Sequence, residues 1–364
     1  LHYMKLDPYF RQYNHRDITF SFFYAFSENF ILPLSHDEVV HGKCSLIVRQ
    51  PGDYWRTMND KRLGRQTVAL SHPPSVLSFS NIGGKFEGQG PLADYFDELS
   101  EDSFFGEKTW EKGEARMQKR VLSRALEKAT RRPEELDLIF AGDLLNQCIG
   151  TSFALREFGV PLCGVYGACS TMSEALNLGS ILIDAGAAQN VAVLTGSHFC
   201  SAERQFRFPL EYGALRTPTS QWTVTGAGAL ILSAGGPGPY VTRVTTGRIV
   251  DMGVKDASNM GAAMAPAACD TLLAHFRETG RAPDYYDAVI TGDLGLTGSA
   301  ILAELLAAEG VALGARHMDC GSVIYDAQRQ GVRSGGSGCG CSASVLAGYV
   351  LENMRSGLWR RVLF

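Results

Sequence analysis

Two stretches of the chain share one pattern, LDLIFAGDL at residues 136–144 and YDAVITGDL at residues 286–294. Each is a short apolar run bounded by turn residues, and each ends in Gly-Asp-Leu. Such a run is typical of a buried strand of a parallel sheet that leads into a loop. Because Gly142-Asp143 and Gly292-Asp293 lie 150 residues apart, the pattern indicates an internal duplication.

A second matched pair follows the first. It consists of GACSTMSEALNLGSILIDAGAAQNVAVL (167–194) and GCGCSASVLAGYVLENMRSGLWRRVLF (338–364). Each opens on glycine, cysteine and serine, continues as an amphipathic helix and ends, after a turn with glycine, in a β-branched run. The order strand, loop, cysteine-bearing helix, strand thus occurs twice. This order predicts an α/β layered fold with two similar halves.

Composition limits the class of protein. The chain has 364 residues, a formal charge of −4 and a hydrophobic fraction of 45%, which are typical of a soluble globular protein. It has no basic tract, so we expect no nucleic-acid binding, and no apolar run near the roughly 18 residues that span a bilayer. The start, LHYMKLDPYF, does not resemble a signal peptide. Nine cysteines without CxxC pairs indicate free thiols in a reducing compartment, so we expect no disulfide framework, metal or cofactor.

Composition also changes along the chain. Residues 1–57 hold 12 of the 36 aromatic residues and four of the eight histidines, but two of the 40 glycines. Met58 then begins a polar stretch, NDKRLGRQ, that looks like a natural N-terminus. We therefore expect two joined proteins, with domains at 1–57, 58–235 and 236–364.

The first segment resembles the 1,4-α-glucan branching enzymes of the α-amylase superfamily. The resemblance rests on residues 4–55, and ENFILPLSHDEVVHGK (28–43) is its most specific part. It implies a barrel strand that delivers His36 and Asp37 to a sugar site. Glycosyl transfer needs a pair of carboxylates, and the strands that would carry the nucleophile and the acid are absent. We expect an unsupported barrel fragment, an inactive remnant of such an enzyme.

The rest of the chain resembles the stage V sporulation protein AD family, nearly end to end from Met58. The motifs that carry this resemblance are EGQGPLADYFDE, FAGDLLNQ, YGACSTMSEA, GSHFCSAERQFRFPLEYG, VTGAGA, DMGVKDASNMGAAMAPAA, TGDLGLTGS, HMDCGSVIYD and GGSGCGCSA. The resemblance implies a thiolase-like duplicated αβαβα fold, commonly dimeric across the edge of the first half. The family continues beyond RRVLF (360–364), so we expect the second half to be truncated by about two sheet elements.

Cys169, just ahead of the predicted helix 171–184, stands where condensing enzymes of this fold carry their nucleophile. A helix N-terminus stabilises a thiolate or another anion, although a cysteine there also serves as a small packing residue. Catalysis further needs a base and an oxyanion hole from histidine or asparagine on loops of the second half. GGSGCGCSA (335–343) contains neither residue, and His317 is the one nearby candidate. The sequence therefore favours binding over condensation.

The resemblance implies dipicolinic acid (pyridine-2,6-dicarboxylate) as the ligand, taken up into the forespore with other stage V sporulation membrane proteins as partners. It also implies a soluble protein, peripheral to the forespore or spore inner membrane. Helix N-termini and glycine-rich backbone suit carboxylates. The candidate ligand-binding residues are Asp143, Cys169, Ser170, Ser197, His198, Arg204, Gly336, Ser337 and Cys339.

Several of these residues have structural alternatives. His198 at a strand end is more often structural than functional. Arg204 or Arg207 can fork onto a carboxylate or form a salt bridge to Glu203 or Glu211. Asp143 and Asp293 can each cap the loop that follows. Two functional hypotheses remain, a carrier of dipicolinic acid and an acyl-thioester condensing enzyme that uses Cys169.

Overall fold

A computed structural model of the chain describes residues 61–206 and 216–364. The chain divides into two units, Leu1–Arg49 and Gln50–Phe364, and the described residues all belong to the second. The predictions for residues 1–57, with His36 and Asp37, lie outside the described residues, as do Arg207 and Glu211. The predicted domain boundaries at 57/58 and 235/236 stay predictions.

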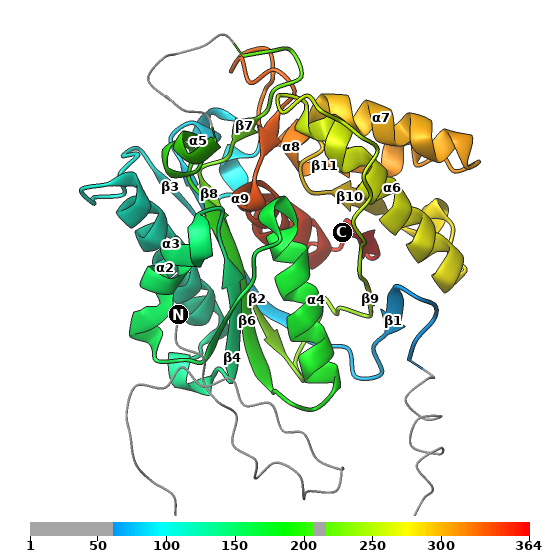
Figure 1. Cartoon of the computed structure of the whole chain (residues 1–364). Coiled ribbons are helices and arrows are strands. Elements are labelled where there is room, and N and C mark those ends of the chain that lie inside the picture. Colours follow the sequence, from blue (N-terminus) through cyan, green and yellow to red (C-terminus); the bar gives the residue numbers. More distant parts are fainter. Residues whose placement is uncertain (1–60, 207–215) are drawn as a thin grey trace, which may run out of the picture. The chain divides into compact units, whose positions relative to one another are not determined.

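The first half is built on a six-stranded sheet in the order β3-β2-β8-β6-β4-β5 (Figure 1). Strands β4, β5 and β6 run parallel to one another, whereas β8 is antiparallel to both β6 and β2. The strand bounds are β2 Ser75–Gly84, β3 Glu98–Ser100, β4 Leu138–Gly142, β5 Leu162–Gly164, β6 Asn190–Ser197 and β8 Gly226–Ser233.

The second half repeats this arrangement in a three-stranded sheet, β11-β10-β13. All three strands are parallel. In both halves the first strand in the chain lies in the middle, with the second on one side and the third on the other. This shared topology, β5-β4-β6 and β11-β10-β13, confirms the duplication. The bounds are β10 Ala288–Thr291, β11 His317–Asp319 and β13 Val362–Leu363.

Helices form three layers around the two sheets. Helices α2 and α3 cover the outer face of the first sheet, α4 and α9 lie between the sheets, and α6 packs against α7 beyond the second sheet. The predicted αβαβα order is therefore confirmed. The helix bounds are α2 Trp110–Ala129, α3 Ile149–Leu155, α4 Thr171–Asp184, α6 Met260–Thr279, α7 Gly295–Ala308 and α9 Cys339–Val345.

Alternation along the strands explains the layering. In β10, Ala288 and Ile290 face the central core, whereas Val289 belongs to the core under α6 and α7. In β4, Phe140 faces the central core and Ile139 the core under α2. Successive strand residues point to opposite faces, so each sheet can be covered by helices on both sides.

The remaining elements are short. They are β1 Thr67–Ala69, β7 Trp222–Thr223, β9 Arg243–Thr245, β12 Gly336–Ser337, α5 Phe199–Phe206, α8 Cys320–Val323 and α10 Leu351–Arg355. Strand β1 pairs with β9, and β7 pairs with β12. No helix within 61–206 and 216–364 combines the length and apolar character needed to cross a membrane.

Candidate functional site

The starts of α4 and α9 meet between the two halves. Cys169 lies in a 3-10 turn, Ala168–Ser170, that leads into α4, and Cys339 is the first residue of α9. The Ser342 hydroxyl donates to the carbonyl of Cys169 at 3.4 Å, which joins the two helix starts directly. The cysteines predicted from the two matched motifs are thus brought together.

Asp293, just beyond β10, completes this cluster. The Cys169 thiol donates a hydrogen bond to the Asp293 carboxylate, and the Gly338 N–H donates to Asp293 Oδ2 at 2.8 Å. Asp293 is buried, with 5% of its surface exposed. The sequence offered Asp293 as a loop-capping residue, whereas the structure places its carboxyl between the two helix starts.

Burial dominates the protonation of this cluster. It raises the pKa of Asp293 to about 6, against the hydrogen bonds from Cys169 and Gly338. Burial and the adjacent Asp293 carboxylate also raise the pKa of the Cys169 thiol well above its usual range. The site therefore holds a neutral thiol beside a carboxyl that titrates near neutrality. An activated nucleophile needs the opposite shift, a lowered thiol pKa.

A glycine-rich turn forms the opposite side of the site. Gly338 has φ +96°, a conformation that favours glycine, and its N–H is the donor to Asp293. The Gly340 N–H donates to Ser197 Oγ at 3.1 Å, and the Cys339 thiol donates to the Gly196 carbonyl at 3.2 Å. Ser197 thus holds the turn in place from the end of β6.

Asp143, the counterpart of Asp293, has a different role. It is fully buried and accepts hydrogen bonds from the Leu145 N–H at 2.7 Å and from both the N–H and the hydroxyl of Thr151 at 2.6 Å. These donors hold the loop before α3. The carboxylate of Asp143 is therefore occupied by its own loop.

Three other predicted residues make contacts away from Cys169. His198 is buried, with Nε2 2.7 Å from the Ser103 carbonyl and Nδ1 accepting from the Cys200 N–H at 3.1 Å. Arg204 pairs with Glu111. Ser170 is exposed, and its hydroxyl donates to the Gly167 carbonyl.

Gly336 and Ser337 directly precede Gly338 in the chain. They form β12, which pairs with Trp222 and Thr223 of β7. The Gln221 amide donates to the Gly336 carbonyl at 2.9 Å and to the Asp293 carbonyl at 2.7 Å. These contacts fix the backbone that leads to Gly338 and the backbone of Asp293 relative to each other.

The four histidines of the described residues contact partners outside the cluster of Cys169 and Asp293. His72 lies 3.8 Å from Asp184, and His275 lies between Thr245 and Tyr286. His317, the candidate base of the sequence analysis, has Nε2 3.0 Å from Thr291 Oγ1. His198 contacts Ser103, as above. The described residues also contain no group of three or more His, Cys, Asp or Glu side chains arranged to hold a metal ion.

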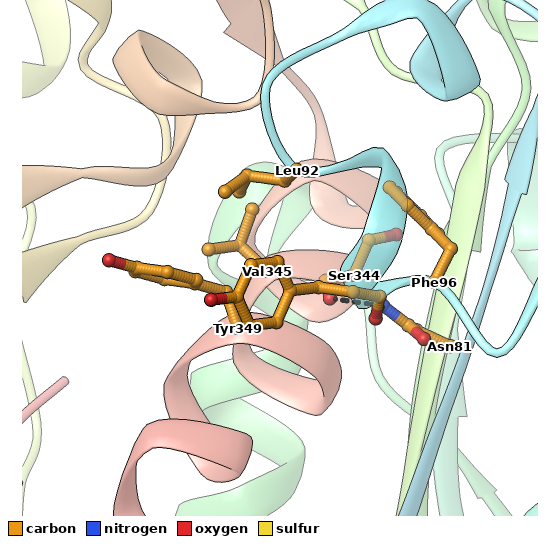
Figure 2. A pocket seen from close by; sticks show the side chains of 7 residues that line it. Asn81, Leu92, Phe96, Ser344, Val345 and Tyr349 are labelled. Atoms are coloured by element: carbon orange, nitrogen blue, oxygen red, sulfur yellow. Dashed lines mark hydrogen bonds between the residues drawn. The ribbon is translucent and has the colours of Figure 1, made fainter. Parts of the chain in front are cut away.

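Two hollows lie away from Cys169. The first, between β2 and α9, is filled by its own side chains and leaves no room for water; Asn81 there donates to the Ser344 carbonyl at 2.9 Å (Figure 2). The second is an open surface hollow of about 430 Å³ at the ends of α6 and α7, lined in part by Arg277 and Arg281. Arg277 pairs with Glu309, and Arg281 stacks on Tyr285, 4.2 Å from the ring centre.

Two similar halves, five layers and paired cysteine-bearing helix starts define a protein of the thiolase fold. Solved structures of OleA from Xanthomonas campestris share this architecture. The cerulenin-bound OleA structure has a TM-score of 0.52 at 16% identity, and a histidine-to-asparagine variant with cerulenin has a TM-score of 0.54 at 12% identity. Each comparison covers 78% of this chain and 89% of the OleA chain.

Sequence comparison identifies the family. The family model for Stage V sporulation protein AD matches residues 64–364. The Stage V sporulation protein AD of Bacillus subtilis (strain 168) is 39% identical over 302 residues, which cover 83% of this chain and 89% of that protein. The chain belongs to the stage V sporulation protein AD family, and it is a sporulation protein with a thiolase-like fold.

A shorter stretch matches a different family. The 1,4-alpha-glucan branching enzyme GlgB of Marinobacter nauticus is 54% identical over 86 residues, and that of Halothermothrix orenii is 51% identical over 86 residues. These matches cover 24% of this chain and 13% of each enzyme. The resemblance to branching enzymes is thus confirmed for a short segment, one longer than the 57 residues assigned to it from the sequence.

Proposed function

We propose that the chain binds dipicolinic acid for its uptake into the forespore, at the cluster formed by Cys169, Asp293 and the Gly338–Cys339 turn. The chain's membership of a sporulation family supports a function during sporulation. The observation that carries the proposal is Asp293: a buried carboxyl with a pKa of about 6 lies between a thiol and a backbone N–H, at the meeting point of the two halves.

The chemistry of the cluster suits an aromatic dicarboxylate. Dipicolinate carries roughly two negative charges at neutral pH, since carboxyl groups are ionised there. Protonated Asp293 can donate a hydrogen bond to one carboxylate, and the N–H groups at the starts of α4 and α9 can donate to the other. Uptake crosses a membrane, so the proposal includes stage V sporulation membrane proteins as partners.

Isothermal titration of dipicolinic acid into the full chain tests this proposal. We expect saturable binding that weakens at least about tenfold in Cys169→Ala and Asp293→Ala, since each removes a direct contact. Arg204→Ala is the matched control, because Arg204 pairs with Glu111 and should not change the affinity. No binding by a folded wild-type sample, or equal affinity in all variants, would contradict the proposal.

An acyl-thioester condensing enzyme is the second candidate. The position of Cys169 at the start of α4 favours it, because a helix N-terminus stabilises a thiolate. The raised pKa of the Cys169 thiol and the Asp293 carboxylate beside it oppose it. Incubation with an acyl-CoA, followed by mass spectrometry of the peptide that carries Cys169, separates the two. Rapid stoichiometric acylation at pH 7 would favour the enzyme.

A further inference from the structure

Arginines gather at the edge of the second sheet where its strands begin. Arg281 lies between α6 and β10, Arg361 directly precedes β13, and Arg243 lies in β9. We name these three residues the arginine cluster. Because β10, β11 and β13 are parallel, their starts share one edge, opposite to the edge where Asp293 follows β10. The arginine cluster is therefore separate from the site of Cys169 and Asp293.

Two guanidinium groups of the cluster share one aromatic ring. The guanidinium carbon of Arg281 lies 4.2 Å from the centre of the Tyr285 ring, and that of Arg361 lies 4.5 Å from it. A guanidinium group that stacks on a ring keeps its N–H donors along its own edge, where an acceptor can reach them. Tyr285 thus orients two arginines that come from distant segments of the chain.

A chain of hydrogen bonds places Arg243 on the same side of the molecule. Thr245 Oγ1 lies 2.7 Å from His275 Nδ1, and His275 Nε2 lies 2.7 Å from the Tyr286 hydroxyl oxygen. Arg243 and Thr245 lie on one face of β9, because strand residues two positions apart point the same way. Arg243 therefore lies on the face of β9 that is turned toward Tyr286, the residue after Tyr285.

The arginine cluster has no carboxylate partner in the part of the chain that the structure describes. By contrast, Arg248, which follows β9, forms a two-pronged ion pair with Asp270 at 2.6 and 2.8 Å. Asp287 interacts electrostatically with Arg361, but its Oδ2 accepts from the backbone N–H groups of Arg360 and Arg361 at 2.7 and 2.9 Å. The guanidinium groups of the cluster therefore keep donors for another acceptor.

One donor of the cluster is buried and unpaired. The Nε atom of Arg243 has no hydrogen-bond acceptor among the described residues. A buried N–H without an acceptor lowers stability, and folded proteins contain few of them. Burial, and then the like charge of Arg281, lower the pKa of Arg243. Burial, and then these two arginines, also lower the pKa of His275 to about 4, so the cluster is a region of uncompensated positive charge.

From this arrangement we infer that the arginine cluster binds a phosphate group. A phosphate group on a small molecule carries about 1.5–2 negative charges at neutral pH and has three strong acceptor oxygens. Guanidinium groups from three segments suit these three oxygens, whereas a flat carboxylate offers two oxygens in one plane. A bound phosphate would offset the repulsion between Arg243 and Arg281, and it would supply the acceptor that Arg243 Nε lacks.

Isothermal titration of inorganic phosphate into the full chain at constant ionic strength tests the site. We expect saturable binding that Arg281→Gln weakens at least about tenfold, because this variant removes a charge and a fork of donors. Arg281→Lys keeps the charge but loses the fork, and it should weaken binding nearly as much. Arg116→Gln is the matched control: Arg116 lies on α2 in the first half, pairs with Glu107 at 2.9 Å, and its loss should leave the affinity unchanged. Arg361→Gln provides a second variant if Arg281→Gln does not fold.

A phosphate group can belong to a free small molecule or to a lipid headgroup, and vesicles of phosphatidylcholine with and without phosphatidic acid separate these sources. Cosedimentation with the phosphatidic acid vesicles that Arg281→Gln abolishes would assign a lipid phosphate; binding of free phosphate alone would assign a small molecule. Dipicolinate titration should be unaffected by Arg281→Gln, so failure of this inference and failure of dipicolinate binding are separate results. Binding of neither probe by the folded wild type, or equal binding by wild type, Arg281→Gln and Arg361→Gln, would overturn the inference.

Discussion

Asp143 and Asp293 occupy equivalent strand ends but differ in one neighbour. Thr151 donates two hydrogen bonds to Asp143, and the residue 150 positions later is Ile301, which has no side-chain donor. The carboxyl of Asp293 is therefore free of its own loop and lies beside Cys169. The sequence contains this difference between Thr151 and Ile301. It predicts that Asp293 lacks the hydrogen bonds that hold Asp143, but it does not predict where the Asp293 side chain lies.

The first prediction concerns the pH dependence of dipicolinate binding. A dianion beside Asp293 favours the protonated carboxyl, so binding takes up a proton and the affinity should rise as pH falls from 8 to 6, through the pKa of about 6. Asp293→Asn imitates the protonated form and should bind with little pH dependence. Titration calorimetry at pH 6, 7 and 8 measures both. A wild-type affinity that falls toward pH 6 would contradict this assignment.

The second prediction concerns Glu87, which is buried in the turn Glu87–Gln89 and accepts hydrogen bonds from the Tyr325 hydroxyl and the Thr225 N–H. Burial raises its pKa from 4.5 to about 7. The folded state therefore keeps a proton that the unfolded state loses, and stability falls as pH rises from 4.5 to 7.

Glu87→Gln removes this titration. Its free energy of unfolding, relative to the wild type, should increase by up to about 3 kcal/mol between pH 4.5 and 7.5. Urea unfolding at a series of pH values measures the difference. A difference that stays constant with pH would show that the Glu87 carboxyl is not protonated in the folded state.

At the scale of elements, the start of α9 packs backbone to backbone against the first sheet. A Cβ added to Gly340 would lie 2.3 Å from the Gly226 carbonyl oxygen, and one added to Gly228 would lie 2.2 Å from that of Ala343. Glycines at these places let the central helix approach the strands closely. The motifs VTGAGA and GGSGCGCSA thus contain the residues on the two sides of this backbone contact.

The third prediction follows from this contact. Gly340→Ala should destabilise the protein by about 2–3 kcal/mol, because the methyl group meets backbone that cannot move aside. Gly235→Ala is the control, since a Cβ there meets nothing within 4 Å and the backbone conformation is ordinary. Thermal unfolding of the two variants compares them. Equal melting temperatures would contradict the close packing.

Sequence patterns predicted some elements well and others poorly. The helix expected at residues 171–184 is observed as α4, Thr171–Asp184. The helix expected after GCGCS begins at Cys339, but a π-helical turn, Leu346–Val350, divides it before α10. The Gly348 Cα lies so close to Asn81 that an added Cβ would be 2.3 Å from its amide nitrogen. Such a break depends on a tertiary neighbour, which periodicity does not contain.

At the scale of the whole described unit, the first strand is held by a distant helix. Glu278 of α6 accepts hydrogen bonds from the backbone N–H groups of Arg65, Gln66 and Thr67 at 2.6–3.2 Å. Thr67 Oγ1 also lies 3.0 Å from Thr245 Oγ1 of β9. The Glu278 carboxylate thus holds residues 65–67, which belong to the first half, against α6 of the second half.

The fourth prediction tests this anchor. Glu278→Gln loses one acceptor oxygen, so amide exchange at residues 65–67 should accelerate by about tenfold or more, corresponding to roughly one lost hydrogen bond to a charged group. Glu309→Gln, which affects an exposed ion pair with Arg277, is the control and should leave these amides unchanged. Unchanged exchange in Glu278→Gln would contradict the anchoring role.

The fold as a whole was predictable because duplicated strands and long motifs are properties of the sequence itself. The site was predictable in part. Cys169 and Cys339 follow from the matched helix starts, but His198 and Arg204 are engaged by Ser103 and Glu111, which lie about 95 residues away along the chain. Side chains at strand ends have several possible partners, and the choice among them is made by tertiary packing.

A crystal structure of the full chain grown with dipicolinic acid is the measurement that decides whether dipicolinate binds at the proposed cluster around Asp293. We predict the pyridine ring between Cys169 and the Gly338–Cys339 turn, with a ligand carboxylate within hydrogen-bond distance of the Asp293 carboxyl. Ligand bound instead in the hollow beside Arg277 and Arg281, or a site at Cys169 that stays empty at saturating dipicolinate, would contradict the account.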